Sequence, residues 1–244
     1  SELASCGAHE GTRRFEYGQA QLKTELSYQT DLSIEYSSAH FVTAFSAFFT
    51  SLNRFVFYTK LKNAFGTDSL VEVDGDRIPA FAFMQRGAKM YGCEWKMDLH
   101  PHPIDWLHWE CGFSYIIGKF SEGMEGVDDM PMMPPAKMTH EIRAELLPDG
   151  KVINSLAIHF SWEKQWKQSR AFTAFDTETP TPGFDVLGAG LQASCMRHGS
   201  KICQFVFSVE NLTNAAYQTH LSRLKYTDLN EVTGRKRSEE HTSE

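Results

Sequence analysis

The chain contains no uninterrupted run of 18 apolar residues, which excludes a transmembrane helix. This absence does not make the chain soluble, because the strands of membrane barrels alternate apolar and polar side chains and so keep the mean hydropathy low. The mean hydropathy of this chain is −0.38. Basic charge is also scarce: 24 Lys and Arg stand against 31 Asp and Glu, for a formal net charge of −7. Because no basic stripe is present, the sequence gives no reason to expect a nucleic-acid partner.

Signatures of catalysis and of cofactor binding are missing as well. The five cysteines are an odd number and include no C-x-x-C pair, which argues against a zinc or redox site. The patterns G-x-S-x-G and H-E-x-x-H, a P-loop and a dinucleotide-binding motif do not occur in the sequence. We therefore expect neither enzyme activity nor a bound cofactor.

The most informative feature that is present is an alternation with a period of two residues. From Leu22 to Tyr36, apolar side chains and Thr occupy one parity and polar side chains occupy the other. Successive side chains of a strand point to opposite faces, so these 15 residues predict a strand with one apolar and one polar face. A strand of that length extends about 50 Å and, tilted by about 45°, crosses the ~25 Å apolar band of an outer membrane. The pattern predicts a lipid-facing wall with a wet interior.

The same alternation recurs further along the chain, and it divides the side chains between two faces. It is found in residues 91–99, 107–117, 156–162, 187–195 and 203–209, whereas Phe41 to Thr50 is apolar at both parities and its faces stay unassigned. Charged side chains at the polar parity could form catalytic pairs, but a solvated inner wall is the favoured interpretation. These side chains are Glu94, Lys96, Asp98, Glu110, Arg143, His159 and Glu163.

The connections between these segments alternate in length. Short ones lie at 37–40, 100–103, 147–150 and 198–200, and long ones at about 61–78, 121–136, 169–182 and from 212 onward. Short turns on one side and long loops on the other are typical of bacterial membrane barrels, with periplasmic turns and extracellular loops. The sequence predicts an all-β fold, an antiparallel transmembrane β-barrel fragment in which eight strands form a meander of hairpins.

Several motifs, taken in order, resemble those of TonB-dependent outer-membrane receptors. The resemblance covers residues 1 to about 236 and corresponds to the C-terminal part of the receptor barrel. The motifs are Glu2-Leu3-Ala4 with His9-Glu10-Gly11-Thr12, Phe15-Glu16-Tyr17-Gly18, Leu22-Lys23-Thr24-Glu25, Gly87-Ala88-Lys89 with Gly92-Cys93-Glu94, Thr179 to Gly190, Asn211-Leu212-Thr213-Asn214-Ala215-Ala216-Tyr217, and His220 to Lys225.

The resemblance implies a barrel of 22 strands, of which this chain would supply strands 14 to 21. Residues 237–244, RSEEHTSE, resemble the translated adapter of a sequencing library, and we expect them to be an artefact outside the fold. The family's plug domain, its TonB box and its last strand would then lie outside this fragment. We predict that the fragment alone aggregates through its open sheet edges.

The function implied by the resemblance is active transport across the bacterial outer membrane. The family takes up scarce, bulky nutrients through coupling to TonB, ExbB and ExbD, with outer-membrane lipid around the barrel and no chemistry on the substrate. A ferric siderophore is favoured, with cobalamin, haem, a metal ion or a glycan as alternatives. Ligand contacts in the extracellular loops and upper lumen are guessed at Arg13, Arg14, Trp166, Arg170 and Tyr217.

Other interpretations remain open. A passive porin and a soluble β-sandwich are rival functions, and an outer-membrane enzyme is disfavoured. The methionines of one long connection could hold Cu(I) but are expected to fill gaps in packing. They are Met124, Met130, Met132, Met133 and Met138. His100 and His102 flank a turn proline and are expected to be solvated rather than metal-bound.

Reflection about the turns places Cys93 opposite Cys111 and Cys195 opposite Cys203. A disulfide within each pair is conceivable, but the favoured interpretation is that the four cysteines are small apolar side chains that fill space.

Overall fold

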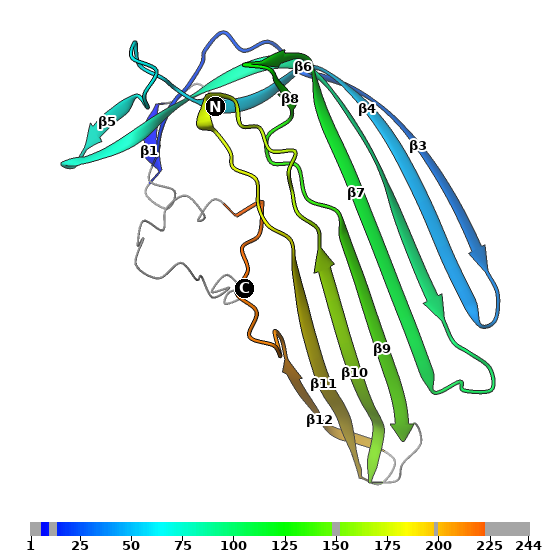
Figure 1. Cartoon of the computed structure of the whole chain (residues 1–244). Helices are drawn as coiled ribbons and strands as arrows, with labels where there is room; N and C mark the ends of the chain where they lie inside the picture. The colour runs from blue at the N-terminus through cyan, green and yellow to red at the C-terminus, as the bar shows by residue number, and fades with distance from the viewer. Residues whose placement is uncertain (1–5, 10–13, 148–151, 198–199, 223–244) are drawn as a thin grey trace.

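The computed structural model describes residues 6–9, 14–147, 152–197 and 200–222, and it forms one curved, open sheet (Figure 1). Eight long strands run antiparallel to their neighbours, as the alternation predicts, and each pairs with the next long strand along the chain. They are β3 (Leu26–Ser37), β4 (Phe41–Lys60), β6 (Asp76–Leu99), β7 (Leu107–Met124), β9 (Lys137–Leu147), β10 (Ile153–Gln165), β11 (Phe184–Arg197) and β12 (Ser200–Val209).

Four short strands complete the sheet at the end that carries the long connections. They are β1 (Gly7–His9), β2 (Arg14–Tyr17), β5 (Leu70–Val73) and β8 (Val127–Asp129), and β2 makes the one parallel pairing, with β6. We refer to this end as the loop end and to the opposite end as the turn end. Among the described residues, no helix is long and apolar enough to span a membrane.

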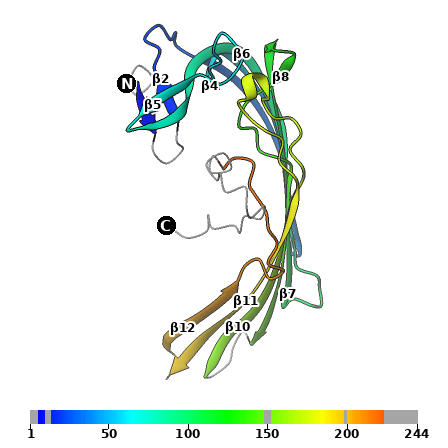
Figure 2. The same ribbon diagram turned by 60° about the vertical axis from the view of Figure 1, so that its left-hand side comes forward.

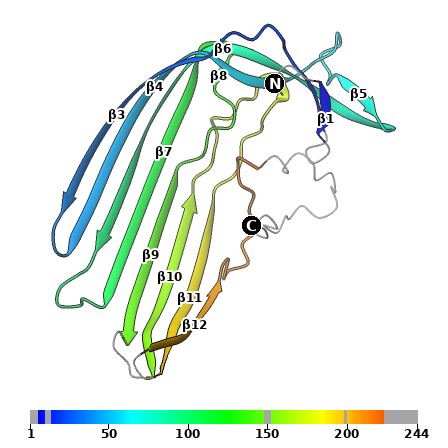
Figure 3. The same cartoon turned by 180° about the vertical axis from the view of Figure 1, so that it is seen from behind.

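The sheet is curved like a trough, with the segment after β12 lying on its concave side (Figures 2 and 3). Its long strands contain up to 24 residues, in β6, where ordinary globular strands have about 5–6. Within the described residues, β3 pairs only with β4 and β12 only with β11, so both lateral edges of the sheet are open. The trough therefore has the shape of part of a wide barrel.

The first long strand is shorter than predicted. It begins at Leu26 rather than Leu22, so four residues of the predicted strand lie outside it. The cause is a side chain: the Lys23 N–H donates to Gln85 Oε1 at 2.8 Å, and Gln85 Nε2 donates to the Lys23 carbonyl at 2.6 Å. Because Gln85 satisfies this backbone, no strand pairing is needed there.

The strand register places the predicted inward-facing charges on one face. Glu110 pairs with Asp98 on one side and with Glu141 on the other, and His159 pairs with Arg143. Residues directly opposite in a ladder share a face. That face is concave, because Asp98, Glu110 and other members of the set line a cavity together with Tyr217 of the segment after β12. The prediction of a polar inner wall is confirmed.

The faces of residues 41–50, left open by the sequence, follow from the register. Phe48 pairs with Gly92, so both lie on the concave face. A Cβ at Gly92 would stand 2.9 Å from Phe48 Cε1 and 2.4 Å from the carbonyl oxygen of Tyr115. Glycine at this position in the family-like motif therefore makes room for an aromatic ring on the inner wall.

The cysteine pairs have different outcomes. Cys195 pairs with Cys203, as predicted, and both are free thiols. The predicted pairing of Cys93 with Cys111 is wrong: Cys93 pairs with Tyr115, and Cys111 pairs with Met97. The reason is the connection between β6 and β7, which extends over residues 100–106 instead of 100–103 and shifts the register.

Candidate functional site

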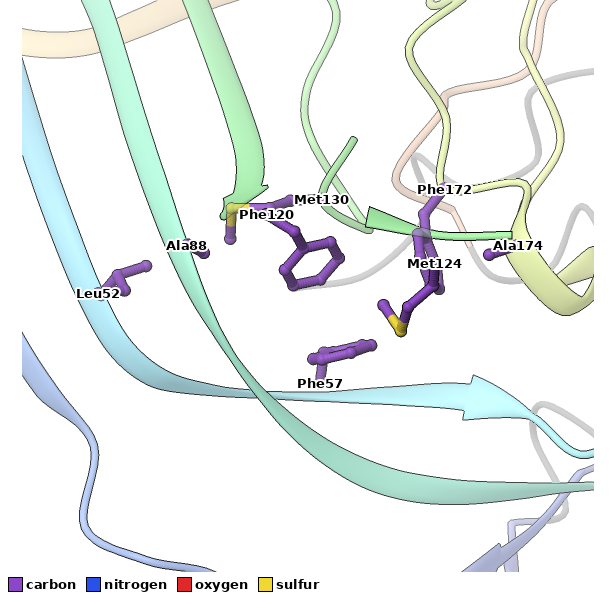
Figure 4. Close-up of a cluster of buried hydrophobic side chains, with 8 residues drawn as sticks. All are labelled: Leu52, Phe57, Ala88, Phe120, Met124, Met130, Phe172 and Ala174. Carbon is purple, nitrogen blue, oxygen red and sulfur yellow. The ribbon is translucent and has the colours of Figure 1, made fainter. Parts of the chain in front are cut away.

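Long connections at the loop end fold onto the concave face and build a hydrophobic cluster there, which we call the loop core (Figure 4). Three rings form its centre: Phe57 lies 4.6 Å from Phe120 and 5.7 Å from Phe172, measured between ring centroids. Phe57 and Phe120 belong to the wall strands, whereas Phe172 comes from the connection between β10 and β11. The buried members are Leu52, Phe57, Ala88, Phe120, Met124, Met130, Phe172 and Ala174.

A β-bulge in β4 explains how the wall reaches this cluster. The register shifts between Leu52 and Phe55, where Arg54 has a φ of 64°. Leu52 pairs with Ala88 and Phe55 with Arg86, so the bulge reverses the parity that faces inward. Phe57 can therefore join Leu52 in one cluster, although an uninterrupted alternation would place them on opposite faces. Sequence analysis missed this, because a bulge leaves no mark on composition.

Methionines at the end of β7 and in the connection between β7 and β9 lie in the same cluster. Met124 and Met130 are buried, with exposed fractions of 5% and 0%. A Cβ at Gly118 on β7 would stand 2.8 Å from the Met130 sulfur and 2.6 Å from the Met133 sulfur. Both thioethers thus pack directly over a glycine of the wall. This agrees with the favoured interpretation of these methionines as fillers of an irregular core.

A buried carboxylate joins two of the long connections. Glu178 is 4% exposed, and its two oxygens accept hydrogen bonds from the backbone N–H groups of Met132, at 2.8 Å, and Phe172, at 3.2 Å. The His220 Nε2 lies 3.9 Å from Glu178, and the His220 Nδ1 is 2.8 Å from Thr181 Oγ1. One acidic side chain thereby fixes the connections around the loop core and the segment after β12.

The family-like Asn-Leu-Thr-Asn-Ala-Ala-Tyr motif forms a compact turn on the concave side. The Asn211 side chain donates to the Ala215 carbonyl at 3.0 Å and accepts from the Ala215 N–H at 2.8 Å. The ring of Tyr217 then stacks on Phe184 at 4.3 Å between centroids. This turn borders a cavity of about 1190 Å³ along the concave face, whose walls also include the charged side chains of Lys96, Glu141 and Glu163.

The comparisons with known proteins agree with this geometry. No family model matches the sequence, and no curated protein matches it. Solved structures do match: the copper transporter OprC, with a TM-score of 0.63 and 16% identity over 83% of this chain, and the FrpB iron transporter from Neisseria meningitidis, with 0.54 and 15% over 87%. The ferric enterobactin receptor PfeA from Pseudomonas aeruginosa matches with 0.55 and 17% over 83%.

The fold is that of the barrel of TonB-dependent receptors. The resemblance stated from the motifs is therefore confirmed for the architecture. This chain covers 28% of OprC, 30% of FrpB and 28% of PfeA, so it spans less than a third of the solved structures that it matches. In a receptor barrel, the concave face corresponds to the lumen and the convex face to the lipid side.

The five guessed ligand contacts are not brought together. Arg13 lies outside the described residues. Arg14 on β2 stacks over the Tyr58 ring at 4.6 Å and forms an ion pair with Glu16. Tyr217 borders the cavity of the concave face. The placement of these residues does not show whether they contact a ligand, so their role in ligand binding stays a guess.

The other two guessed contacts reach the convex side of the sheet. Trp166 packs edge-to-face against Phe113 at 6.0 Å between centroids, and the Arg170 guanidinium lies 5.0 Å from the centre of the Tyr115 ring. Phe113 and Tyr115 have the parity opposite to the inward-facing Glu110. Trp166 and Arg170 therefore lie near the convex side, which in a receptor barrel faces lipid and carries aromatic girdles, rather than near the concave face.

A charged network holds the connection between β4 and β6 against the loop core. Lys62 bonds to Asp68 at 2.8 Å and also to Asp176, and Lys60 bonds to Asp68 at 3.0 Å. The hydrogen bonds to Asp176 and Asp68 raise the pKa of Lys62 above its ordinary value. Burial acts to raise the pKa of Asp68, but the bonds from Lys62 and Lys60 outweigh it and hold that pKa low. Sequence analysis did not identify this network: Lys60, Lys62 and Asp68 are close in sequence, but Asp176 is distant and joins them only in the fold.

Proposed function

We propose that this chain forms part of the barrel of a bacterial outer-membrane receptor that takes up a scarce nutrient by active transport. The energy would come from TonB, ExbB and ExbD, through parts of the receptor outside this fragment, and the favoured nutrient is a ferric siderophore. Two of the similar structures are described as an iron transporter and a ferric enterobactin receptor, and a third as a copper transporter. No chemistry on the nutrient is part of the proposal.

The observation that carries the proposal is the width of the trough. Eight strands are enough to close a small barrel whose interior is filled by side chains. Here eight long strands leave both edges open, at β3 and β12, within the described residues (Figure 1). Closure with this curvature therefore needs many more strands, which gives a lumen wide enough for a large solute or a plug.

The two faces of the sheet fit such a receptor. The concave face carries the charged side chains of the inner wall and would be wet. The convex face exposes aromatic and aliphatic side chains, including Tyr36, Trp109 and Phe207 with exposed fractions of 59%, 37% and 65%. An apolar outer face with aromatic side chains is what lipid contact requires. The loop core then closes part of the lumen at the extracellular end.

The rival functions predict other features. A soluble β-sandwich needs a second sheet over the apolar face. The strands of the described residues, by contrast, all belong to one sheet. A passive porin shares the barrel but not the coupling to TonB. Transport that stops when TonB is removed therefore separates the receptor from the porin.

Uptake of labelled nutrient by intact cells tests the proposal. The gene is deleted, and uptake of ⁵⁵Fe bound to a catecholate siderophore is compared with and without TonB, with ⁵⁵Fe-hydroxamate, ⁶⁴Cu and ⁵⁷Co-cobalamin as parallel probes. We expect one probe to lose its high-affinity uptake on deletion and equally on loss of TonB. Uptake that depends on the gene but persists without TonB would favour the porin.

A further inference from the structure

Three side chains with metal-binding atoms converge at the turn end of the concave face. Asp98 lies near the end of β6, His100 directly follows that strand, and His108 lies near the start of β7. One ligand atom from each residue lies within 4.8 Å of those of the other two. The His100 Nε2 is 2.8 Å from Asp98 Oδ1, and the rings of His100 and His108 are 4.3 Å apart between centroids.

The strand register produces this cluster. Leu99 pairs with Trp109, so the next two positions, His100 and His108, face each other. Asp98 shares the face of His100, because side chains two residues apart in an extended segment point the same way. The His100 N–H donates to the His40 carbonyl at 2.8 Å, which holds His100 in place. The cluster is therefore built on paired backbone and needs no special loop conformation.

The surroundings favour a cation. Glu110 pairs with Asp98 across the two strands, and Glu145 Oε1 lies 3.9 Å from His108 Nε2. Two positive charges share this face: Arg143, which pairs with His108 and lies 3.7 Å from Glu145, and Lys96, which precedes Asp98 by two residues on β6. Water can enter from the concave side, since the side chains of Asp98 and His100 are 40% and 37% exposed. The three carboxylates of Asp98, Glu110 and Glu145 therefore outnumber the two positive charges around the imidazoles, of which His100 is the more accessible.

The donor set matches a borderline-soft divalent ion. Two imidazoles and one carboxylate, with a further position for water or substrate, are a ligand set of Zn²⁺, and imidazole also suits Cu²⁺ and Ni²⁺. Bonds of about 2.0–2.2 Å place the ligand atoms of a tetrahedral site about 3.3 Å apart. Atoms already within 4.8 Å reach that spacing by small side-chain rotations.

We propose that Asp98, His100 and His108 form a binding site for a divalent transition-metal ion, with Zn²⁺ as the best fit. Water or a neighbouring carboxylate, Glu110 or Glu145, completes the coordination. The site lies at the opposite end of the sheet from the loop core, so it is separate from the surface proposed to receive the nutrient. In the receptor orientation it faces the periplasm.

The test uses the intact barrel that contains this segment, purified in detergent and freed of metal with a chelator. Equilibrium dialysis with Zn²⁺ measures stoichiometry and affinity, and electron paramagnetic resonance of the Cu²⁺ form counts coordinated nitrogen atoms. We expect one tightly bound Zn²⁺ and two coordinated nitrogens. Because loss of a supporting side chain already lowers metal affinity about 10–100-fold, His108→Ala, which removes a ligand, should lower it about 100-fold and leave one nitrogen.

A matched control comes from the same turn. The His102 Nδ1 lies 3.3 Å from Asp105, outside the cluster, so His102→Ala should bind Zn²⁺ as the unaltered protein does. Asp98→Asn keeps the side-chain size and should weaken binding with both nitrogens retained. Heat-modifiable migration in gels checks that each variant keeps its barrel. Unchanged affinity in folded His100→Ala and His108→Ala variants, or no Zn²⁺ bound by the unaltered protein, would overturn the proposal, whatever the outcome of the uptake assay.

Discussion

Glu178 accepts a hydrogen bond from the backbone N–H of Met132 at 2.8 Å, across 46 positions of sequence. The same carboxylate accepts a second bond from Phe172 in a buried environment. Glu178→Gln replaces one acceptor oxygen with an NH₂ group that faces a backbone donor. We expect the connections 125–136 and 166–183 to lose about 1–3 kcal/mol of local stability. Hydrogen exchange of the N–H groups of Met132 and Phe172 measures this, and unchanged protection would show that Glu178 does not hold them.

Phe172 provides the sharpest test of the loop core. Its ring is fully buried against Phe57 and Phe120, so Phe172→Ala should leave a cavity and cost about 3–5 kcal/mol. Phe65, in the connection between β4 and β6, is 90% exposed, and Phe65→Ala should have almost no effect. Thermal unfolding of the intact barrel and limited proteolysis at the loop end compare the two. Equal behaviour of the variants would mean that the loop core is not packed as described.

Gly118 tests the same core from the wall. A side chain there meets the sulfur atoms of Met130 and Met133, so Gly118→Val should displace the connection between β7 and β9 and cost about 1–3 kcal/mol. Gly7 has open space around its Cβ position, and Gly7→Ala is the control. The rate of proteolytic cleavage within 125–136 is the measurement. Cleavage as slow in Gly118→Val as in Gly7→Ala would contradict the packing.

The network of Lys62 and Asp68 predicts a pH window for the connection between β4 and β6. The pKa of Asp68 is lower in the folded state than its ordinary 3.8, so its contribution is present above that pH and is lost as pH falls through the folded value. The pKa of Lys62 is raised above 10.5, so its contribution is present below that pH and is lost as pH rises through the folded value.

Protection of residues 61–69 against proteolysis or exchange should therefore be constant from about pH 5 to about pH 9 and fall at both extremes. Asp68→Asn should remove the fall in protection at acid pH and should lower protection throughout the range from about pH 5 to about pH 9. A marked change in protection near pH 7 would point to groups outside this network. Both side chains are accessible to solvent, so high salt should weaken their contribution.

How far the sequence predicted this structure depends on the kind of information needed. The period of two residues is local, and it was sufficient for six of the eight long strands and for the inward direction of charges such as Glu110. It did not assign the faces of residues 41–50, and residues 137–147 were not among the alternating segments. Register across a connection is not local: the longer path from His100 to Trp106 changed the partner of Cys93. The bulge at Arg54 and the buried Glu178 depend on contacts between distant segments, so neither could be predicted from spacing. The proposed metal site at Asp98, His100 and His108 required the same register information.

The open edges at β3 and β12 predict the behaviour of the segment by itself. Unpaired backbone groups on both edges, next to exposed side chains such as Phe205 and Phe207, should drive pairing between copies. Expressed without the rest of the barrel, the chain should form oligomers in detergent that sediment as a broad distribution. The intact barrel should sediment as one species. A monodisperse monomer of the segment would show that its edges are protected.

The length of β6 has a consequence for where the molecule meets its surroundings. Its 24 residues extend about 80 Å, whereas a strand tilted by about 45° needs about 35 Å to cross a 25 Å apolar band. In the proposed receptor, more than half of the strand would therefore project past the lipid, together with the connections built on it. In the proposed receptor this projecting wall would lie outside the cell, within reach of an antibody or a membrane-impermeant label.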